Sequence, residues 1–496
     1  MTRWTGRRHP TEPPSGARQP FTIIDEVECY FDTTHEPANV PLEVRVPFHL
    51  DQATFRAAVL AALTASPRAS ARRVRPGLLS RSYYWERPAQ FDVDPVSCSA
   101  FADEDELTAQ RDAFTAQSPP LDQSPVVRLL LASGPGGDCV ILNGHHAAMD
   151  GSSWLELLRD IGRRYRSGHP PPADHAESGG ATARAVLALA PATQPGRPLP
   201  ETPRPAADPL PARVGRSRPA ARTWLSRLPA RIAADGGGQH GVGIQLTLLP
   251  GVPRVPDPGG SADRPTLNDA LVTALIVTVG RWNAGRGKPI RPVKVSVPVN
   301  ARTPGQQAAG NLSRLARVCA IPPAAGTSPA DLLLEVAGQT HRARMPVGAR
   351  ERPEFRAVAG LWCPAPVKRW LLRAALRTVG PAICDTVMLT NLGRVEDPPD
   401  FGGQEPVTMA FSGTAQMPRG LSVAGITAGG QLQISIRYNR RLVSAAAASQ
   451  FAAEFNAALG ELTVAPEGGR PAAGGPDLRR AENSPIAGNP RATGRR

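Results

Sequence analysis

Aromatic residues and long apolar runs are both scarce in this chain of 496 residues. Phe, Trp and Tyr make up only 5% of the sequence, and no basic run is interleaved with them, which disfavours nucleic-acid binding. No stretch approaches the roughly 18 apolar residues of a membrane-spanning helix, and the amino-terminal residues lack the apolar segment of a secretory signal. The sequence therefore predicts a cytoplasmic protein with no membrane span and no nucleic-acid partner.

Signatures of metal and covalent chemistry are missing as well. The six cysteines lie far apart and form no CxxC pair; they are at positions 29, 98, 139, 319, 363 and 384. This pattern predicts free thiols packed in a reduced protein. Neither an HExxH motif nor a G-x-S-x-G nucleophile elbow occurs, so we expect no metal site and no covalent nucleophile.

Basic residues outnumber acidic ones by 57 to 43, which gives a formal net charge of +14. Such a field attracts polyanions, among them anionic lipid, a phosphorylated cofactor or an acidic carrier protein. Much of the excess lies in segments that are rich in Pro and Gly and lack periodicity. We predict a disordered leader over 1–19, a partly disordered linker over 167–222 and a disordered tail over 464–496. Two ordered regions, 20–166 and 223–463, remain.

Hydrophobic periodicity in both ordered regions indicates a mixed α/β fold. In the first region we expect strands within 21–31 and 40–50, a helix over 51–66 behind Asp51, and a β-hairpin over 126–145. A helix should follow Gly151, with Ser153 and Glu156 as its capping box. The second region predicts helices within 265–283, 330–344, 366–380 and 444–462, and strands within 243–250, 292–300, 384–393, 406–415, 421–430 and 432–439. Trp282, Trp362 and Trp370 stand among apolar residues at helical spacing and are expected in the core.

The stretch NGHHAAMDGSSW, residues 143–154, is the strongest candidate for chemistry. A strand ends at His145, and alternation along it turns His145 and His146 to opposite sides, so only one imidazole can face a given cavity. A neutral imidazole is a suitable general base near neutral pH. Asp150 could orient that histidine or pair with an arginine, and Gly151 leaves room for a close approach of backbone or ligand. From these residues alone, a purely structural hydrogen-bonding cluster remains an alternative.

The segment HHAAMDG fits the HHxxxDG signature and resembles a superfamily of acyltransferases. Its members include the condensation domains of nonribosomal peptide synthetases, chloramphenicol acetyltransferase, polyketide-associated acyltransferases and wax ester synthases. Further stretches are similar to stand-alone condensation proteins in the right order, namely those over 118–132, 265–282, 295–313 and 386–395. The resemblance covers about 21–463. It implies two chloramphenicol-acetyltransferase-like lobes arranged as a V, with the active-site tunnel between them.

The resemblance also implies a role for each motif residue. His146 would be the general base in the tunnel and His145 would be structural. Asp150 would form a structural salt bridge with an arginine, for which Arg72 and Arg128 are the candidates. Arg72 is favoured, because the early helix of the first lobe ends near the motif in relatives. Gly151 would keep the tunnel open.

Asn300 and Asn391, in the second lobe, would line the substrate tunnel, although an asparagine at such a place can also simply cap a turn.

The implied activity is transfer of an acyl or aminoacyl group from a thioester to an amine or a hydroxyl, in natural-product biosynthesis. The donor would be an acyl-CoA or the phosphopantetheine thioester of an acyl or peptidyl carrier protein, and the acceptor a small amine or alcohol. No tightly bound cofactor is implied. Two alternatives remain open: an O-acyltransferase that resembles wax ester synthases and acts on lipid alcohols at a membrane surface, and a catalytically silent module that recruits a partner protein.

Overall fold

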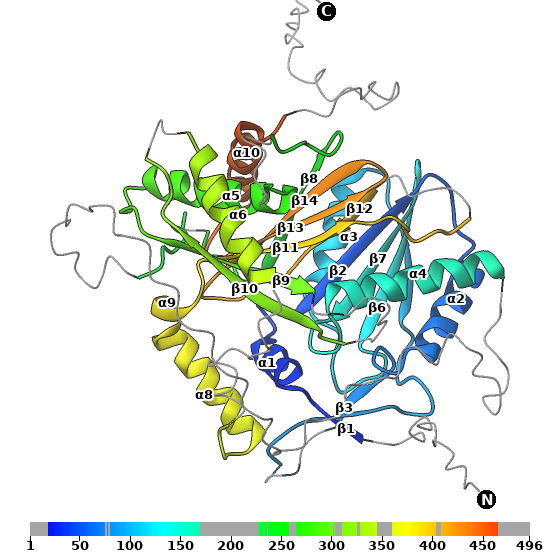
Figure 1. Cartoon of the computed structure of the whole chain (residues 1–496). Coiled ribbons are helices and arrows are strands. Elements are labelled where there is room, and N and C mark those ends of the chain that lie inside the picture. Colours follow the sequence, from blue (N-terminus) through cyan, green and yellow to red (C-terminus); the bar gives the residue numbers. More distant parts are fainter. Residues whose placement is uncertain are drawn as a thin grey trace, which may run out of the picture.

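Two β-sheets, each with helices packed against it, form the two lobes of the computed structural model (Figure 1). The structure describes residues 18–74, 77, 80–168, 228–235, 237–256, 264–300, 302, 310–324, 328–344, 360–402 and 408–464. The predicted linker from residue 169 on, and most of the predicted leader and tail, lie outside the described residues. The leader was predicted two residues too long, because Arg18 and Gln19 already belong to strand β1 (Arg18–Pro20), which pairs with β4 (Tyr84–Glu86).

The first lobe is built on a five-stranded sheet in the order β12-β2-β7-β6-β5. Its strands are β12 (Thr408–Phe411), β2 (Asn39–Val46), β7 (Gly137–His145), β6 (Val127–Gly134) and β5 (Val96–Ala100). Helices α2 (Gln52–Ala65) and α4 (Gly151–Ser167) pack against each other over one face, and α3 (Glu104–Thr115) contacts β7 from the other. The hairpin β6–β7 and the helix behind Asp51 confirm the sequence-based predictions.

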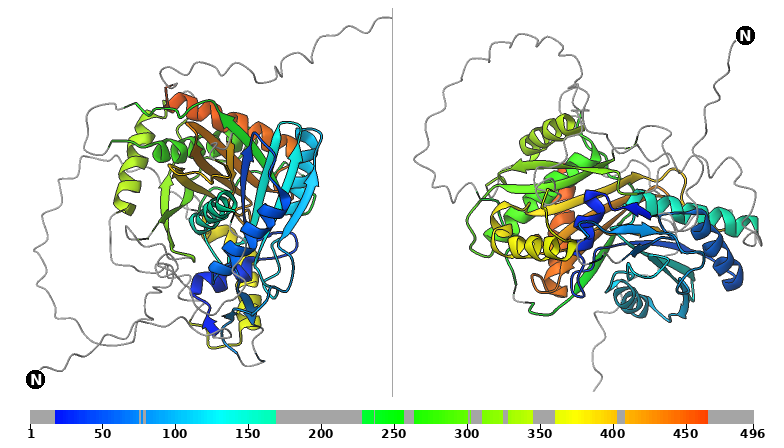
Figure 2. Two further views of the ribbon diagram at one scale, coloured as in Figure 1. Left: turned by 90° about the vertical axis from the view of Figure 1, so that its right-hand side faces the viewer. Right: turned by 90° about the horizontal axis from the view of Figure 1, so that it is seen from below.

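The second lobe is built on a six-stranded sheet in the order β10-β9-β11-β13-β14-β8. Its strands are β10 (Ser313–Ala320), β9 (Val293–Asn300), β11 (Val387–Arg394), β13 (Leu421–Ala428), β14 (Gln431–Asn439) and β8 (Val242–Leu249). Alternate residues of β14, such as Leu432, Ile434 and Ile436, share a buried core with α5 (Leu267–Ala284) and α10 (Ala445–Leu462). Helix α6 (Ala330–Arg344) packs on α5 and β10. Residues of β14 between these, including Ser435 and Arg437, face the first lobe. Figure 2 shows the two sheets of the lobes from two further directions.

Two features join the lobes. Strand β12 lies in the second region of the sequence but pairs with β2, so the predicted range 223–463 does not build the second lobe alone. Arg437 of β14 is fully buried and donates to the carbonyl oxygen of Asn39 at 3.0 Å and to its side-chain oxygen at 2.5 Å. Burial disfavours the charged guanidinium and lowers the pKa of Arg437 to about 10, against the opposing effect of Asp112. The seam between the lobes is therefore partly polar.

Residues 21–31 form a helix, α1 (Ile23–Phe31), and the strand predicted there is wrong. The reason is a capping box: the Thr22 hydroxyl accepts from the Asp25 amide, and the Asp25 carboxylate accepts from the Thr22 amide, both at 3.2 Å. The helix then buries Val27 and Tyr30 on one side. Bulky apolar residues in this short run suggested a strand, but the two capping bonds and burial of one side favour the helix.

The three tryptophans expected in the core differ in burial. Trp282 is buried and donates to the carbonyl oxygen of Ala233 at 3.0 Å, as predicted for a core residue. Trp362 and Trp370 are 83% and 67% exposed, so the prediction is wrong for both. They lie before and within α8 (Ala365–Thr378), which is followed by the short α9 (Gly380–Ile383) at the periphery of the molecule.

Candidate active site

The histidine motif lies where β7 leaves the first sheet and α4 begins. The last residue of β7 is His145, which stands opposite Asn39 of β2. Helix α4 starts at Gly151 itself, slightly before the predicted start after that residue, and is capped at its end by Gly168 in the left-handed conformation. Its cap is Asp150, whose Oδ1 accepts from the Ser153 amide at 3.0 Å, so the predicted capping box of Ser153 and Glu156 is wrong. The motif is thus a short loop held between a strand end and a helix cap.

His145 is completely buried; one ring nitrogen is hydrogen-bonded and the other lies near a carboxylate. Its Nδ1 accepts from the Ala147 amide at 3.0 Å, which places the proton of a neutral ring on Nε2. Nε2 lies 3.7 Å from Oδ2 of Asp32. Burial alone would raise the pKa of Asp32, but His145, the Ala38 amide and the Ser118 hydroxyl together hold that pKa below its usual value. This arrangement fixes the ring of His145 in the interior.

His146 has a different environment, since its backbone is fixed while its ring is not. Its amide donates to the carbonyl oxygen of Ala38 at 2.7 Å, and its carbonyl oxygen accepts from Asn311 at 2.9 Å. The residue is half-buried. Its Nδ1 is buried and has no hydrogen-bond partner among the described residues. Because Nδ1 is closed off, proton transfer from a bound group would have to use the other ring nitrogen, Nε2.

Asp150 pairs with Arg302, from the segment that follows β9. The guanidinium binds the carboxylate with two bonds, Nη2 to Oδ1 at 2.9 Å and Nη1 to Oδ2 at 3.0 Å. Both side chains are nearly buried, with exposed fractions of 12% and 6%. Two parallel charge-assisted bonds in such a setting are strong and directional. They tie the start of α4 in the first lobe to the second lobe.

The two arginines proposed for this pair from the sequence lie elsewhere. Arg72 starts β3 (Arg72–Val74) and binds Asp92 at 2.9 Å and Glu86 at 3.2 Å. Arg128 donates to the carbonyl oxygens of the neighbouring residues 125 and 127. The prediction failed because the start of α4 faces the second lobe, whereas both candidates were sought in the first.

Residues 310–313, before and into β10, complete the enclosure of the motif. Oδ2 of Asp150 accepts from the Leu312 amide and the Ser313 hydroxyl, both at 3.1 Å. Asn311 donates to the carbonyl oxygens of His146 and Ala147, at 2.9 and 3.1 Å, and to Asp25 at 3.1 Å. The second lobe therefore holds the motif loop through both its carboxylate and its backbone.

Gly151 is needed for packing, and the expectation that it keeps a tunnel open is wrong at this point of the structure. A Cβ on Gly151 would lie 2.8 Å from the ring of Phe411 and 3.3 Å from Leu392. Phe411 belongs to β12 and Leu392 to β11. The space beside the Cα of Gly151 is filled by these side chains, which lets α4 start close against the second lobe.

Comparisons with known proteins bear on the family and the fold of the chain. No family model matches the chain. Two uncharacterised proteins of Mycobacterium tuberculosis, MT2362 and Rv2305, are each 30% identical to it over 471 residues, which cover 88% of this chain and 98% of the relative. The chain belongs to their family. Solved structures are also similar to this chain.

Two of these structures are condensation domains. The first condensation domain of the calcium-dependent antibiotic synthetase, in complex with a substrate analogue, superposes with a TM-score of 0.57 at 16% identity, over 90% of this chain and 96% of that one. A mutant starter condensation domain of rhizomide synthetase, in complex with C8-CoA and Leu-SNAC, gives 0.54 at 13% identity, over 89% and 92%. The chain therefore has the condensation-domain fold, and the predicted two-lobed α/β architecture is confirmed.

In this condensation-like fold the two predicted tunnel asparagines make local contacts. Oδ1 of Asn300 accepts from the backbone and the guanidinium of Arg302, at 3.0 and 3.3 Å. Oδ1 of Asn391 accepts from the Gly393 amide at 2.9 Å. Asn300 thus orients the arginine that binds Asp150, and Asn391 bridges a register irregularity at the end of β11. Contact of either with a substrate stays a prediction.

Sequence reasoning missed Arg302 as the partner of Asp150 and Asn311 as the clamp on the motif. Both lie in the stretch 295–313 that carried part of the resemblance, so a signal was present. Their separation from the motif, 152 residues for the ion pair and 165 for the Asn311–His146 bond, has no local pattern to reveal it.

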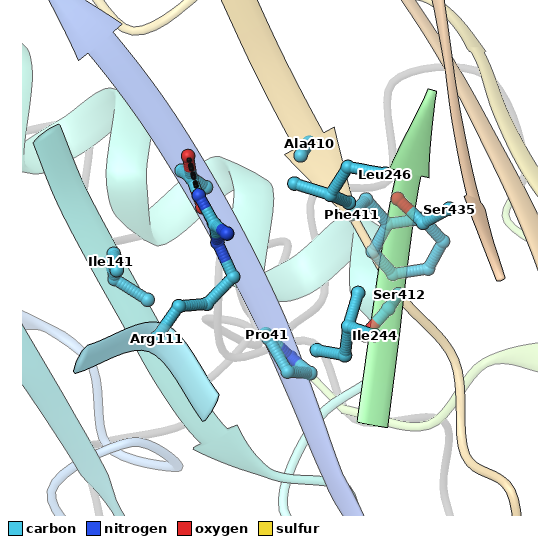
Figure 3. Close-up of a pocket in the computed structure, with 10 residues that line it drawn as sticks. Pro41, Arg111, Ile141, Ile244, Leu246, Ala410, Phe411, Ser412 and Ser435 are labelled. Atoms are coloured by element: carbon cyan, nitrogen blue, oxygen red, sulfur yellow. Dashed lines mark hydrogen bonds and ion pairs between the residues drawn. The ribbon is translucent and has the colours of Figure 1, made fainter. Parts of the chain in front are cut away.

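A small pocket lies at another part of the seam and contains no motif residue. Its cavity volume is about 20 Å³, and it lies between β2 and β12 on one side and β8 and β14 on the other (Figure 3). The buried pair of Arg111 and Glu43 forms one wall, and the hydroxyls of Ser412 and Ser435 form part of another. It is therefore separate from the candidate active site.

The described part of the chain contains neither a membrane-spanning helix nor a metal-binding cluster. None of its helices is long and apolar enough to cross a membrane. Nor do the described residues bring together three or more His, Cys, Asp or Glu side chains in a way that could hold a metal ion.

Proposed function

We propose that this protein is a condensation-type acyltransferase that uses His146 as its general base. It would move an acyl or aminoacyl group from a thioester to an amine or a hydroxyl. The observation that carries the proposal is the contrast at the motif: the backbone of His146 is held from both lobes, while its imidazole makes no hydrogen bond to the described residues. The condensation-domain fold supports the same function.

The chemistry needs one base and good positioning. The acceptor nitrogen or oxygen attacks the thioester carbonyl carbon while the imidazole of His146 takes its proton. The tetrahedral intermediate then expels the thiolate, which receives the proton from the imidazolium, so the ring returns to its neutral state. A positioned base of this kind contributes about 10²–10⁴-fold, and orientation of the two substrates supplies most of the rest. No covalent intermediate on the protein is required.

Asp150 and Arg302 act in this scheme as positioning residues. Their ion pair and the bonds of Asn311 fix the loop, so that the ring of His146 presents the same nitrogen to each acceptor. The Asp150 carboxylate is fully engaged with Arg302, Ser153, Leu312 and Ser313. It therefore supports the base without taking part in proton transfer.

The donor we propose is acyl-CoA or the phosphopantetheine thioester of a carrier protein, both of which are anionic. A chain with a formal net charge of +14 attracts either one. A mutant condensation domain of the same fold has been solved in complex with C8-CoA and Leu-SNAC, which supports a thioester donor. We propose cytoplasmic natural-product biosynthesis as the setting.

An assay of thioester consumption tests this function. The full chain is given a panel of acyl-CoA and acyl-carrier-protein donors with mixed amine and alcohol acceptors, and products are read by mass spectrometry. We expect transfer that falls by about 10²–10⁴-fold in His146→Ala. His49→Ala is the matched control, because His49 is an exposed histidine of the same lobe that pairs with Asp138.

Two results would contradict parts of the proposal. Transfer that survives in His146→Ala would remove the general base while leaving the acyltransferase. No transfer with any donor, together with tight binding of a carrier protein, would favour the silent recruiting module instead. A folded His146→Ala variant, checked by circular dichroism, is required for either conclusion.

A lipid-alcohol acceptor is the second candidate, as in the alternative that resembles wax ester synthases. The exposed tryptophans beside and within α8 favour it, because they give the protein a surface suited to lipid. Long-chain alcohols among the acceptors would decide between the two.

A further inference from the structure

We propose that the outer side of α8, with the residues that flank it, docks on the surface of an anionic phospholipid bilayer. We define this α8 face by its exposed apolar side chains, which are Leu361, Trp362, Val367, Trp370, Leu371, Val379 and Ile383. The proposal is independent of the acyltransferase activity.

Exposed large apolar side chains are concentrated at this face. The described residues include 14 such side chains, and 7 of them lie within residues 361–383. Trp362 and Trp370 are the most exposed, at 83% and 67%. Single exposed apolar residues are ordinary in proteins, but a cluster with two tryptophans indicates a surface that meets another apolar phase.

The opposite side of α8 is bonded to the rest of the protein, and these contacts determine that the α8 face points outward. Arg373 donates to the carbonyl oxygens of Tyr30 and Asp32, at 3.0 and 2.6 Å, where α1 ends. Arg369 also donates to Asp32, at 3.0 Å, and the buried Lys368 lies 3.8 Å from Glu26. Helix α8 therefore presents its polar side inward and its apolar side outward. The helix lies at the edge of the molecule (Figures 1 and 2).

The charge of the segment matches an anionic surface. Residues 361–384 contain no Asp or Glu. Their basic residues Lys368, Arg369 and Arg373 are turned inward, so the positive charge at the α8 face comes from Arg81 and Arg377. The guanidinium of Arg81 lies over the Trp362 ring, 3.4 Å from its centroid, and Arg377 is exposed at the far end of α8. Each basic residue near an anionic leaflet strengthens binding by roughly fivefold. No carboxylate of the segment opposes that attraction.

These observations favour a bilayer over other occupants of the face. Helices that lie in a membrane interface carry Trp and Leu on one side and Lys or Arg beside it, which is the pattern here. A second copy of the chain would bring Arg81 and Arg377 of one α8 face close to the same residues of the other, since a twofold contact pairs each patch with itself. Dimerisation is therefore disfavoured electrostatically, and an acidic protein surface becomes an outcome of the test.

Flotation of the full chain with vesicles tests the proposal. We expect the protein to float with vesicles of equal parts phosphatidylcholine and phosphatidylglycerol and to float less with phosphatidylcholine alone. The double variant Trp370→Glu with Leu371→Glu should lower the partition coefficient by about tenfold or more, because it places two carboxylates in the docked surface. Leu334→Glu is the matched control: Leu334 is 44% exposed on α6 and lies outside the α8 face.

A second readout locates the contact. Brominated phosphatidylcholine in the same vesicles should quench tryptophan fluorescence, and the quenching should shrink in Trp362→Phe combined with Trp370→Phe. Flotation that the double glutamate variant retains would assign binding to other basic segments and overturn the proposal. Absence of flotation, combined with dimerisation or capture of an acidic carrier protein that the same variant abolishes, would show that the α8 face binds protein.

Discussion

At the scale of single residues, Gly151 shows how tightly the motif is packed. Replacing a helical glycine by alanine ordinarily stabilises a protein by up to about 1 kcal/mol. In Gly151→Ala, however, the new Cβ would lie 2.8 Å from Phe411. We expect this clash to outweigh the helix preference and to lower the free energy of unfolding by about 1–3 kcal/mol, measured by urea denaturation.

Gly460→Ala in α10 is the control, since a Cβ added there would meet nothing within 4 Å beyond its own helix, and the substitution should be neutral or stabilising. Combining Gly151→Ala with Phe411→Leu should recover part of the loss. A Gly151→Ala variant as stable as the wild type would mean that Phe411 moves aside at little cost.

At the same scale, the identity of the motif residues could be predicted, but their partners could not. The strand before His145 and the cap before Gly151 follow from local periodicity and from residue types. The Asp150–Arg302 pair joins residues 152 positions apart, and only the docking of two lobes creates it. The role of Asn311 could not be predicted either, because it depends on the backbone oxygens that its side chain reaches.

At the scale of elements, the buried pair of Glu43 and Arg111 joins β2 to α3. Arg111 donates to both carboxylate oxygens of Glu43, at 2.5 and 3.0 Å. Burial opposes ionisation of Glu43, but Arg111 and then Arg45 outweigh it and hold the pKa of Glu43 below its usual value. Stability from this carboxylate is therefore present above the ordinary carboxyl pKa of about 4.3 and is lost as the pH falls through the lower pKa of the folded state.

We predict that Glu43→Gln lowers the free energy of unfolding by about 3–5 kcal/mol at pH 7, because it leaves the Arg111 charge uncompensated. The difference from the wild type should narrow as the pH falls below about 4, because the Glu43 carboxyl of the unfolded chain then protonates while the folded protein keeps it ionised to lower pH. Urea denaturation at both pH values measures it. A gap between the two proteins that stays constant with pH would refute the assigned charge state.

The type of element could be predicted where the periodic pattern was long, and the prediction failed where the apolar run was short. Helix α4 and the β6–β7 hairpin have the expected bounds. The strand prediction for residues 23–31 is wrong, although Thr22 and Asp25 have the spacing of a capping box, which is a signal for a helix start. The prediction that Trp362 and Trp370 are buried failed for another reason. Periodicity identifies an apolar side of a helix but does not say whether other parts of the protein cover that side.

At the scale of the whole molecule, the fold class followed from sequence, while the way the lobes interlock did not. Strand β12 crosses into the first sheet, Arg437 reaches Asn39, and Arg302 reaches Asp150. Each of these contacts joins segments that are distant in sequence. One is strand pairing and two are side-chain contacts, and none has a periodic pattern in the sequence that would predict it. They concentrate at the motif loop, so the candidate site depends on assembly of both lobes.

This dependence leads to a last prediction about Arg302. Arg302→Ala leaves the nearly buried Asp150 carboxylate without its cation, and we expect a loss of about 3–5 kcal/mol in the free energy of unfolding. Arg72→Ala is the matched control: its ion pairs are partly exposed, at 34% for Arg72, and should contribute about 1 kcal/mol or less. Asp150→Asn keeps a competent helix cap, so a double-mutant cycle of Asp150→Asn with Arg302→Ala isolates the ion pair from the cap. Coupling of about 2 kcal/mol or more would mean that the pair clamps the two lobes at the motif, whereas additive losses would mean that Asp150 acts on α4 alone.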